Sequence, residues 1–153
     1  MAVSRRALLG AVVVLGAGTY AATGGRNLFY DVLRPDVNAE LLPADQAHER
    51  AAAGDILLVD IRRPDEWEKT GSAAPGVRLD MRREDFTDAL AELVEGQRDA
   101  PIALICARGV RSARLTNQLT EAGFTNIIDV PEGMLGSSAG PGWLKRGLPL
   151  DQS

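Results

Sequence analysis

The chain has 153 residues, of which 45% are hydrophobic, and this length and composition suit one domain with its own buried core. The formal net charge is −4, and all charge before Asp31 is positive, which leaves 14 basic against 21 acidic residues after Arg26 and argues against nucleic acid as a partner. One cysteine and one histidine form neither an internal disulfide nor a Cys/His zinc cluster, so no metal and no cofactor are expected.

Residues 1–25 have the layout of an export signal, with a basic start, an apolar run and then small residues. The segment Ser4–Leu9, SRRALL, resembles the twin-arginine export motif. The apolar stretch Ala7–Ala22 has 16 residues, just short of the roughly 17–25 that a membrane span needs. We expect export to the periplasm or another extracytoplasmic compartment, with this segment cleaved or retained as a membrane anchor. Contact with the membrane is expected only through it.

Residues 26–38 are interpreted as a connector and residues 39–151 as the domain. Within the domain, segments with apolar residues at helical spacing alternate with the short apolar runs typical of buried strands. Helices are expected at 43–53, 64–69, 84–94 and 112–122, and strands at 55–61, 77–79, 101–105 and 126–130. The glycine-rich stretch 133–142 is expected to be a loop, followed by a last helical turn within 143–150. This alternation predicts an α/β fold with a central, mostly parallel sheet and helices on both faces.

The only cysteine, Cys106, directly follows the predicted strand 101–105, at the sheet edge where sites form in such folds. The next residues must turn the chain sharply into a helix, and Gly109 relieves the strain of that turn. A tight strand-to-helix turn points backbone N–H groups inward beside a positive helix end, and Arg108 and Arg111 add formal charge. A buried cysteine is often inert packing, but an inert core position has no use for a cationic loop. We therefore expect an ionised, nucleophilic thiol.

The stretch Cys106–Ser112, CARGVRS, resembles the active-site loop C-x-x-G-x-R-S of rhodanese-like sulfurtransferase domains. Three further segments resemble the same family in the same order: LLVDIRRPDEW, TGSAAPGVRLDM and DVPEGMLGSSAGPGWLKRGLPL. The resemblance therefore covers about residues 39–151. Three departures are visible: Ser72 stands where the family often has histidine, the segment GSAAPG has one residue more than the family pattern GHIPG, and the loop between Gly133 and Trp143 is longer than the family's minimal version.

Together with the expected export signal, the resemblance implies an exported, single-domain sulfurtransferase. Cys106 would take the outer sulfur of a small anionic donor such as thiosulfate, and its persulfide would pass that sulfur to cyanide, a thiol or a partner protein. The substrate-binding residues implied by the loop are Ala107, Arg108, Gly109, Val110, Arg111 and Ser112. Asp60 and Arg62, at the end of a neighbouring strand, are expected to support the pocket, either as a structural ion pair or by direct action.

Other functions remain open at this point. One is a non-catalytic rhodanese module that binds sulfur or delivers it to a partner. Another is a phosphatase or arsenate reductase of the same fold, although those enzymes have one residue more than the four that separate Cys106 from Arg111. A Cys/His pair is not supported, because the only histidine, His48, is expected on the solvated face of the first domain helix.

Overall fold

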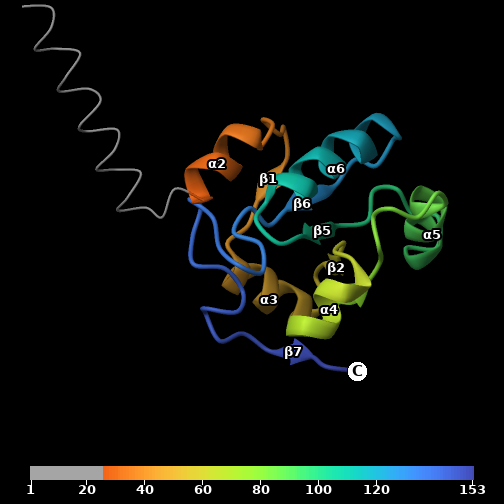
Figure 1. Cartoon of the computed structure of the whole chain (residues 1–153). Coiled ribbons are helices and arrows are strands. Elements are labelled where there is room, and N and C mark those ends of the chain that lie inside the picture. The colour runs from red at the N-terminus through yellow and green to blue at the C-terminus, as the bar shows by residue number, and fades with distance from the viewer. Residues whose placement is uncertain (1–25) are drawn as a thin grey trace, which may run out of the picture.

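The centre of the fold is strand β5 (Ile102–Ile105), all of whose residues are buried. A continuous apolar run of this kind is typical of a parallel strand that is covered on both faces. The computed structural model describes residues 26–153 and orders five parallel strands (Figure 1) as β1 (Glu40–Leu41), β6 (Ile127–Asp129), β5, β2 (Leu57–Asp60) and β4 (Val77–Arg78).

Helices cover both faces of this sheet, as the sequence predicted. Helix α3 (Ala44–Ala53) lies on one face, and α5 (Phe86–Leu93) and α6 (Val110–Glu121) lie on the other. Because side chains alternate along a strand, Ala103 and Ile105 of β5 join the core under α3, whereas Leu104 and Cys106 join the core under α5 and α6. The α/β fold class is therefore confirmed, and Cys106 belongs to the α6 side.

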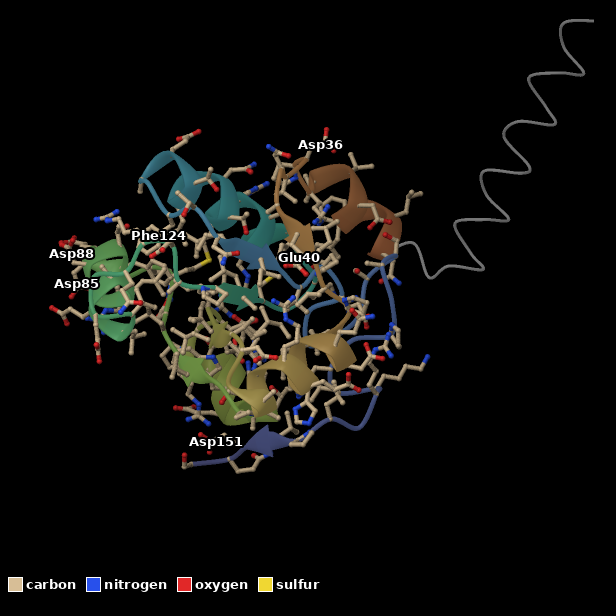
Figure 2. All side chains as sticks on the ribbon, turned by 180° about the vertical axis from the view of Figure 1, so that it is seen from behind. Asp36, Glu40, Asp85, Asp88, Phe124 and Asp151 are labelled. Carbon is tan, nitrogen blue, oxygen red and sulfur yellow. The ribbon has the colours of Figure 1, made fainter. Side chains whose placement is uncertain are left out.

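The polar faces of the helices point to solvent. Figure 2 shows Asp85 and Asp88 on the outer side of α5, where both are exposed. Phe86 and Leu90, one helical turn apart, are the buried residues of the same helix. This amphipathic spacing explains why α5 forms against the sheet.

Some element boundaries match the expectation and others differ from it. Helix α4 (Pro64–Thr70) matches the predicted helix at 64–69, whereas α6 begins at Val110, two residues before the predicted 112. Strand β1 was not predicted, nor was the antiparallel pair of β3 (Ser72–Ala73) and β7 (Leu150–Asp151). Residues 143–147 form a turn, and the chain then continues into β7. Strands of two residues are too short to leave a periodic pattern in the sequence.

Helix α2 (Arg26–Leu33) lies within the segment interpreted as a connector, and it packs next to α6 (Figure 1). Arg34, just after α2, forms an ion pair with Asp129 of β6 at 2.6 Å, so this segment is tied to the sheet. The predicted export signal or anchor at 1–25 lies outside the described residues. Within residues 26–153, every helix is too short or too polar to cross a membrane.

Candidate active site

The turn that carries Cys106 joins β5 to α6 at the carboxyl edge of the sheet. Gly109 takes the left-handed conformation, with φ at 81°, directly before the first residue of α6. A Cβ at this position would lie 2.3 Å from the carbonyl oxygen of Pro131. Glycine is therefore required twice, for the backbone angle and for the close approach of a second loop. The tight turn predicted from the sequence is present.

A second loop, residues 131–135, lies directly on this turn. The N–H of Met134 donates to the carbonyl oxygen of Cys106 at 2.8 Å, and the N–H of Leu135 donates to that of Ala107 at 2.9 Å. Gly133 permits this contact, because a Cβ there would lie 2.5 Å from the Ala107 oxygen. These bonds hold the cysteine loop in one shape and so fix the direction of the Cys106 side chain.

The Cys106 thiol is 1% exposed and belongs to the apolar core beneath α6. Its Sγ accepts a hydrogen bond from the Gly109 N–H at 3.2 Å and donates to the Ser112 Oγ at 3.5 Å. The first turn of α6 starts beside it and adds the positive end of the helix dipole. The backbone donor and the helix end both favour negative charge on sulfur, which is what a thiolate nucleophile needs.

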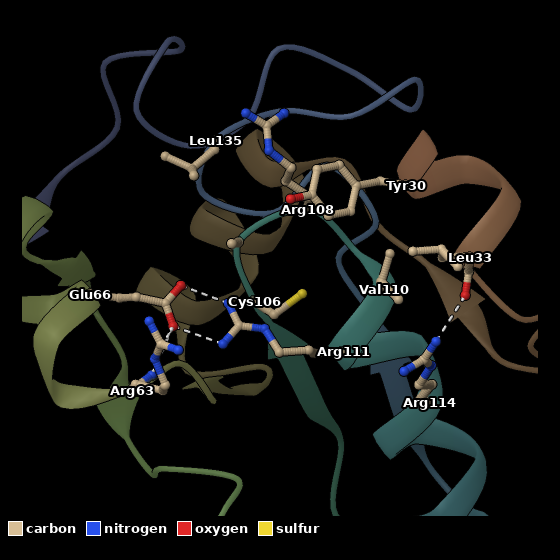
Figure 3. A pocket seen from close by; sticks show the side chains of 11 residues that line it. Tyr30, Leu33, Arg63, Glu66, Cys106, Arg108, Val110, Arg111, Arg114 and Leu135 are labelled. Carbon is tan, nitrogen blue, oxygen red and sulfur yellow. Dashed lines mark hydrogen bonds and ion pairs between the residues drawn. The ribbon is translucent and has the colours of Figure 1, made fainter. Parts of the chain in front are cut away.

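A pocket of about 430 Å³ opens onto this thiol (Figure 3). Its lining comes from α2, α4, the cysteine loop, α6 and the second loop, and consists of Tyr30, Leu33, Arg63, Glu66, Cys106, Ala107, Arg108, Val110, Arg111, Arg114 and Leu135. Four arginines against one glutamate give the lining a positive balance. Such a pocket suits a small anion, and the buried thiol at its wall admits only a small reacting group.

Arg111 does not stand free in the pocket. Its guanidinium forms a two-pronged ion pair with Glu66 of α4, at 2.6 and 2.7 Å (Figure 3). These hydrogen bonds raise the pKa of Arg111; burial opposes the rise, and the negative charge that Cys106 carries when it is ionised adds to it. Burial alone would raise the pKa of Glu66, but the hydrogen bonds from Arg111 and the Arg63 backbone lower it overall. The pair is thus held in its charged form, and Glu66 compensates part of the positive charge that lines the pocket.

Arg108 lies over α2. Its Nη1 donates to the Gly136 carbonyl oxygen at 3.0 Å and to Asn27 Oδ1 at 3.1 Å. Its guanidinium lies 5.3 Å from the ring centroid of Tyr30, within the range of a cation–π interaction. Arg108 therefore joins α2 to the second loop and forms one wall of the pocket.

Asp60 and Arg62 form a fully buried ion pair at 2.8 Å, outside the pocket lining. Arg62 also donates to Thr70 Oγ1 at 3.0 Å and to the Gly71 carbonyl oxygen at 2.7 Å. A buried pair is tolerated when its remaining donors are also satisfied, as they are here. Arg62 thereby attaches the end of α4 to β2, and α4 in turn presents Glu66 to the pocket.

A buried carboxylate, Asp129, lies at the end of β6 on the same sheet edge. Its Oδ2 accepts from Arg34, whereas Oδ1 has no hydrogen-bond partner in the described part of the chain. Burial raises the pKa of Asp129, and the neighbouring Ser112 hydroxyl and Arg34 only partly offset this effect. Ser112 is thus adjacent to both Cys106 and Asp129, a link that the sequence analysis missed.

The expectation that His48 lies on a solvated helix face was wrong. The side chain is half-buried, its Nδ1 lies 2.9 Å from the Ala74 carbonyl oxygen, and its ring meets Trp143 edge to face at 5.7 Å between centroids. The cause is the chain's closing segment, which packs onto α3 and covers this histidine. Because α3 lies on the other face of the sheet from Cys106, the two do not form a pair.

The structure thus brings the whole stretch 106–112 to one turn, with Cys106, Arg108 and Arg111 in the pocket wall. It keeps Ser112 buried behind the thiol and Asp60 with Arg62 beneath α4. Sequence reasoning missed Glu66 and the residues that α2 contributes, Tyr30 and Leu33. Glu66 lies three residues after the helix-capping residue Arg63, and nothing in the sequence around it indicates that it binds Arg111.

Comparisons with known proteins agree with this geometry. A family model described as the rhodanese-like domain matches residues 43–139. An uncharacterized protein of Rickettsia conorii is 28% identical over 103 aligned positions, and the match covers 61% of this chain and 80% of that protein. The tRNA uridine(34) hydroxylase of Acinetobacter baylyi is 28% identical over 101 residues, which make up 65% of this chain but 32% of the hydroxylase.

Among solved structures, that of the polysulfide-sulfur transferase homodimer from Wolinella succinogenes superposes with a TM-score of 0.57 and 24% identity, over 88% of this chain and 91% of that one. This likeness supports the fold. The family model covers well over half of the chain, including β2, β5, the cysteine loop and β6. The chain therefore belongs to the rhodanese-like domain family.

Proposed function

We propose that this protein is a sulfurtransferase that carries sulfane sulfur as a persulfide on Cys106. The observation that carries the proposal is the position of Cys106: it lies in an arginine-lined pocket, with the Gly109 N–H directed at its sulfur. An inert core cysteine needs neither the pocket nor the donor. Membership of the rhodanese-like family supports the same conclusion.

In the first step the Cys106 thiolate attacks the outer sulfur of a donor such as thiosulfate. The donor's S–S bond breaks, its electron pair leaves with sulfite, and Cys106 gains a terminal persulfide sulfur. In the second step cyanide or an acceptor thiolate attacks that outer sulfur, and the bond to Cys106 breaks to regenerate the thiolate. Neither step transfers a proton, so the site needs no general base.

The loop geometry supports each charged species in this cycle. The Gly109 N–H and the start of α6 stabilise negative charge on Sγ, and the same end of the helix faces a bound anion. Arg108 and Arg111 attract the donor electrostatically, with the charge of Arg111 reduced by its pair with Glu66. The size of the pocket and the burial of the thiol favour a donor with a compact sulfur-bearing end.

Turnover of thiosulfate and cyanide to sulfite and thiocyanate tests the proposal. We expect saturable turnover with the native chain and none with Cys106→Ser. A persulfide that forms once but is not turned over would point instead to the sulfur-delivery module. A phosphate-ester assay run in parallel is expected to show no hydrolysis, because four residues between Cys106 and Arg111 make a narrower cradle than a phosphatase loop. Hydrolysis without sulfur transfer would overturn the proposal.

A further inference from the structure

Helix α2 is oriented in the opposite way to an ordinary surface helix, with its polar side toward the protein and its apolar side toward solvent. Its polar side chains face the protein: Asn27 accepts from Arg108, Tyr30 lies under the same guanidinium, and Asp31 accepts from the Ser138 hydroxyl at 2.6 Å. Its apolar side chains face outward, and they form the α2 apolar face, which consists of Leu28, Phe29, Val32 and Leu33. Three of these are 46%, 58% and 79% exposed, in the order Leu28, Phe29, Val32.

This face has no counterpart in the rest of the described chain. A surface helix normally buries its apolar stripe, as α5 does. Exposed apolar side chains that gather on one element mark a site of interaction rather than ordinary surface. The α2 apolar face also borders the pocket: Leu33 belongs to both, and the half-exposed Leu135 lies in the same pocket lining. Whatever covers the face therefore lies at the mouth of the pocket.

The chain that precedes α2 indicates what covers it. The apolar stretch Ala7–Ala22 ends three residues before α2, and those three are Thr23, Gly24 and Gly25. Three residues span at most about 10 Å even when fully extended. A bilayer that holds the apolar stretch therefore brings α2 to its surface. The exposed Arg114, whose Nη2 approaches the Leu33 carbonyl oxygen at 3.4 Å, adds a cation suited to anionic headgroups beside the same face.

We propose that the α2 apolar face lies in the interfacial layer of a lipid bilayer. Short amphipathic helices bind in this way, with the apolar side in the headgroup boundary and the polar side turned away. Here the polar side of α2 accepts hydrogen bonds from Arg108 and Ser138. The same helix therefore contacts the lipid on one side and lines the pocket on the other. The pocket mouth then opens at the membrane surface. As a consequence that rests on the proposed function, sulfur is received and passed on at that surface.

The test places an environment-sensitive dye on the face and a matched dye elsewhere. The full-length chain, with Cys106→Ser so that no other thiol reacts, carries Val32→Cys in one preparation and Leu93→Cys in the other. Val32 is on the α2 apolar face; Leu93 is a half-exposed leucine on α5, outside that face. Each is labelled and reconstituted with vesicles of phosphatidylcholine and phosphatidylglycerol. We expect blue-shifted emission and quenching by lipid-borne nitroxide at position 32, and water-like, unquenched emission at position 93.

Two results would overturn the placement of α2 at the lipid surface. Water-like emission at both positions, in a chain that remains bound to the vesicles, overturns the placement of α2 in the lipid interface. Failure of the chain to bind the vesicles also overturns it. A second variant separates this proposal from the sulfurtransferase: Val32→Ser, outside the pocket lining, should leave thiosulfate turnover in solution unchanged. If the dye at position 32 reports lipid but the native chain, with Cys106 intact, shows no turnover, the placement stands and the proposed function fails.

Discussion

The cysteine loop and helix α2 form two walls of one pocket, yet they are held in opposite ways. The loop is fixed from behind, by backbone bonds to Met134 and Leu135 and by a close contact between Gly109 and Pro131. Helix α2 is held through polar side chains on Arg108 and Ser138, and its apolar residues face outward. Cys106 is thus part of the core, whereas access to its thiol depends on a peripheral element. Changes in the two regions should accordingly affect different measurements.

The largest effect is expected from Gly109→Ala, with Gly54→Ala as its control. Both glycines have positive φ, at 81° and 79°, but only at Gly109 does an added Cβ meet backbone, whereas Gly54 has nothing within 4 Å. Gly54→Ala should cost about 1–2 kcal/mol, the strain of a left-handed alanine. Gly109→Ala should cost at least twice as much in denaturant unfolding and should abolish turnover. Equal losses would show that the contact with the second loop contributes nothing.

The α2 wall should respond to Tyr30→Ala more than to Val32→Ala. Tyr30 lies under Arg108, whereas Val32 is on the exposed side of the same helix and outside the pocket lining. Loss of the cation–π contact should lower the free energy of unfolding by about 0.5–2 kcal/mol and raise the KM for thiosulfate. Val32→Ala should change the free energy of unfolding in solution by less than about 0.5 kcal/mol. The same KM for thiosulfate in the Tyr30 variant and in its control would mean that α2 does not shape the pocket.

The charge that faces the donor can be tuned through Glu66→Gln. The substitution removes the negative charge opposite Arg111 but keeps a side chain of the same shape. The KM for dianionic thiosulfate should fall about three- to tenfold, equivalent to about 0.7–1.4 kcal/mol of binding, with little change in kcat. Asp65→Asn, the neighbouring acid outside the pocket, is the control. A higher KM in Glu66→Gln would show that Glu66 acts mainly by holding Arg111 in place.

The smallest effect is a pH dependence of stability at Asp129. Because burial raises the pKa of Asp129 above the ordinary 3.8, the folded state favours its protonated form. The contribution of protonated Asp129 to the free energy of unfolding is complete below the ordinary pKa of an aspartate. It is lost as the pH rises through the raised pKa of the folded state. The stability of Asp129→Asn relative to the native chain should therefore rise as the pH goes from about 3.5 to 7. Denaturant unfolding across that range checks this, with the exposed Asp88→Asn as the control. A stability difference that falls as the pH rises contradicts it.

The cysteine loop was predictable because its signals are local. A run of buried apolar residues, a glycine and the start of a helix fall within a short stretch, and the chemistry lies in the same residues. Glu66 and Tyr30 were not predictable in this way, since each meets an arginine that is distant in sequence. Residues 26–38 were interpreted as a connector, but the structure places helix α2 there, with its apolar residues away from the core. Asp129 did carry a signal: like Asp60, it ends a parallel strand at the sheet edge where sites form.

The central claim is that Cys106 itself receives sulfur. Intact-mass measurement after incubation with thiosulfate tests it without assuming any acceptor. The account predicts that the native chain gains the mass of one sulfur atom, that a thiol reductant removes it, and that Cys106→Ser gains nothing. Proteolytic fragments should place the added mass on the peptide that contains Cys106. A native chain whose thiol reacts with a small alkylating agent but which gains no sulfur from thiosulfate or polysulfide would contradict the account.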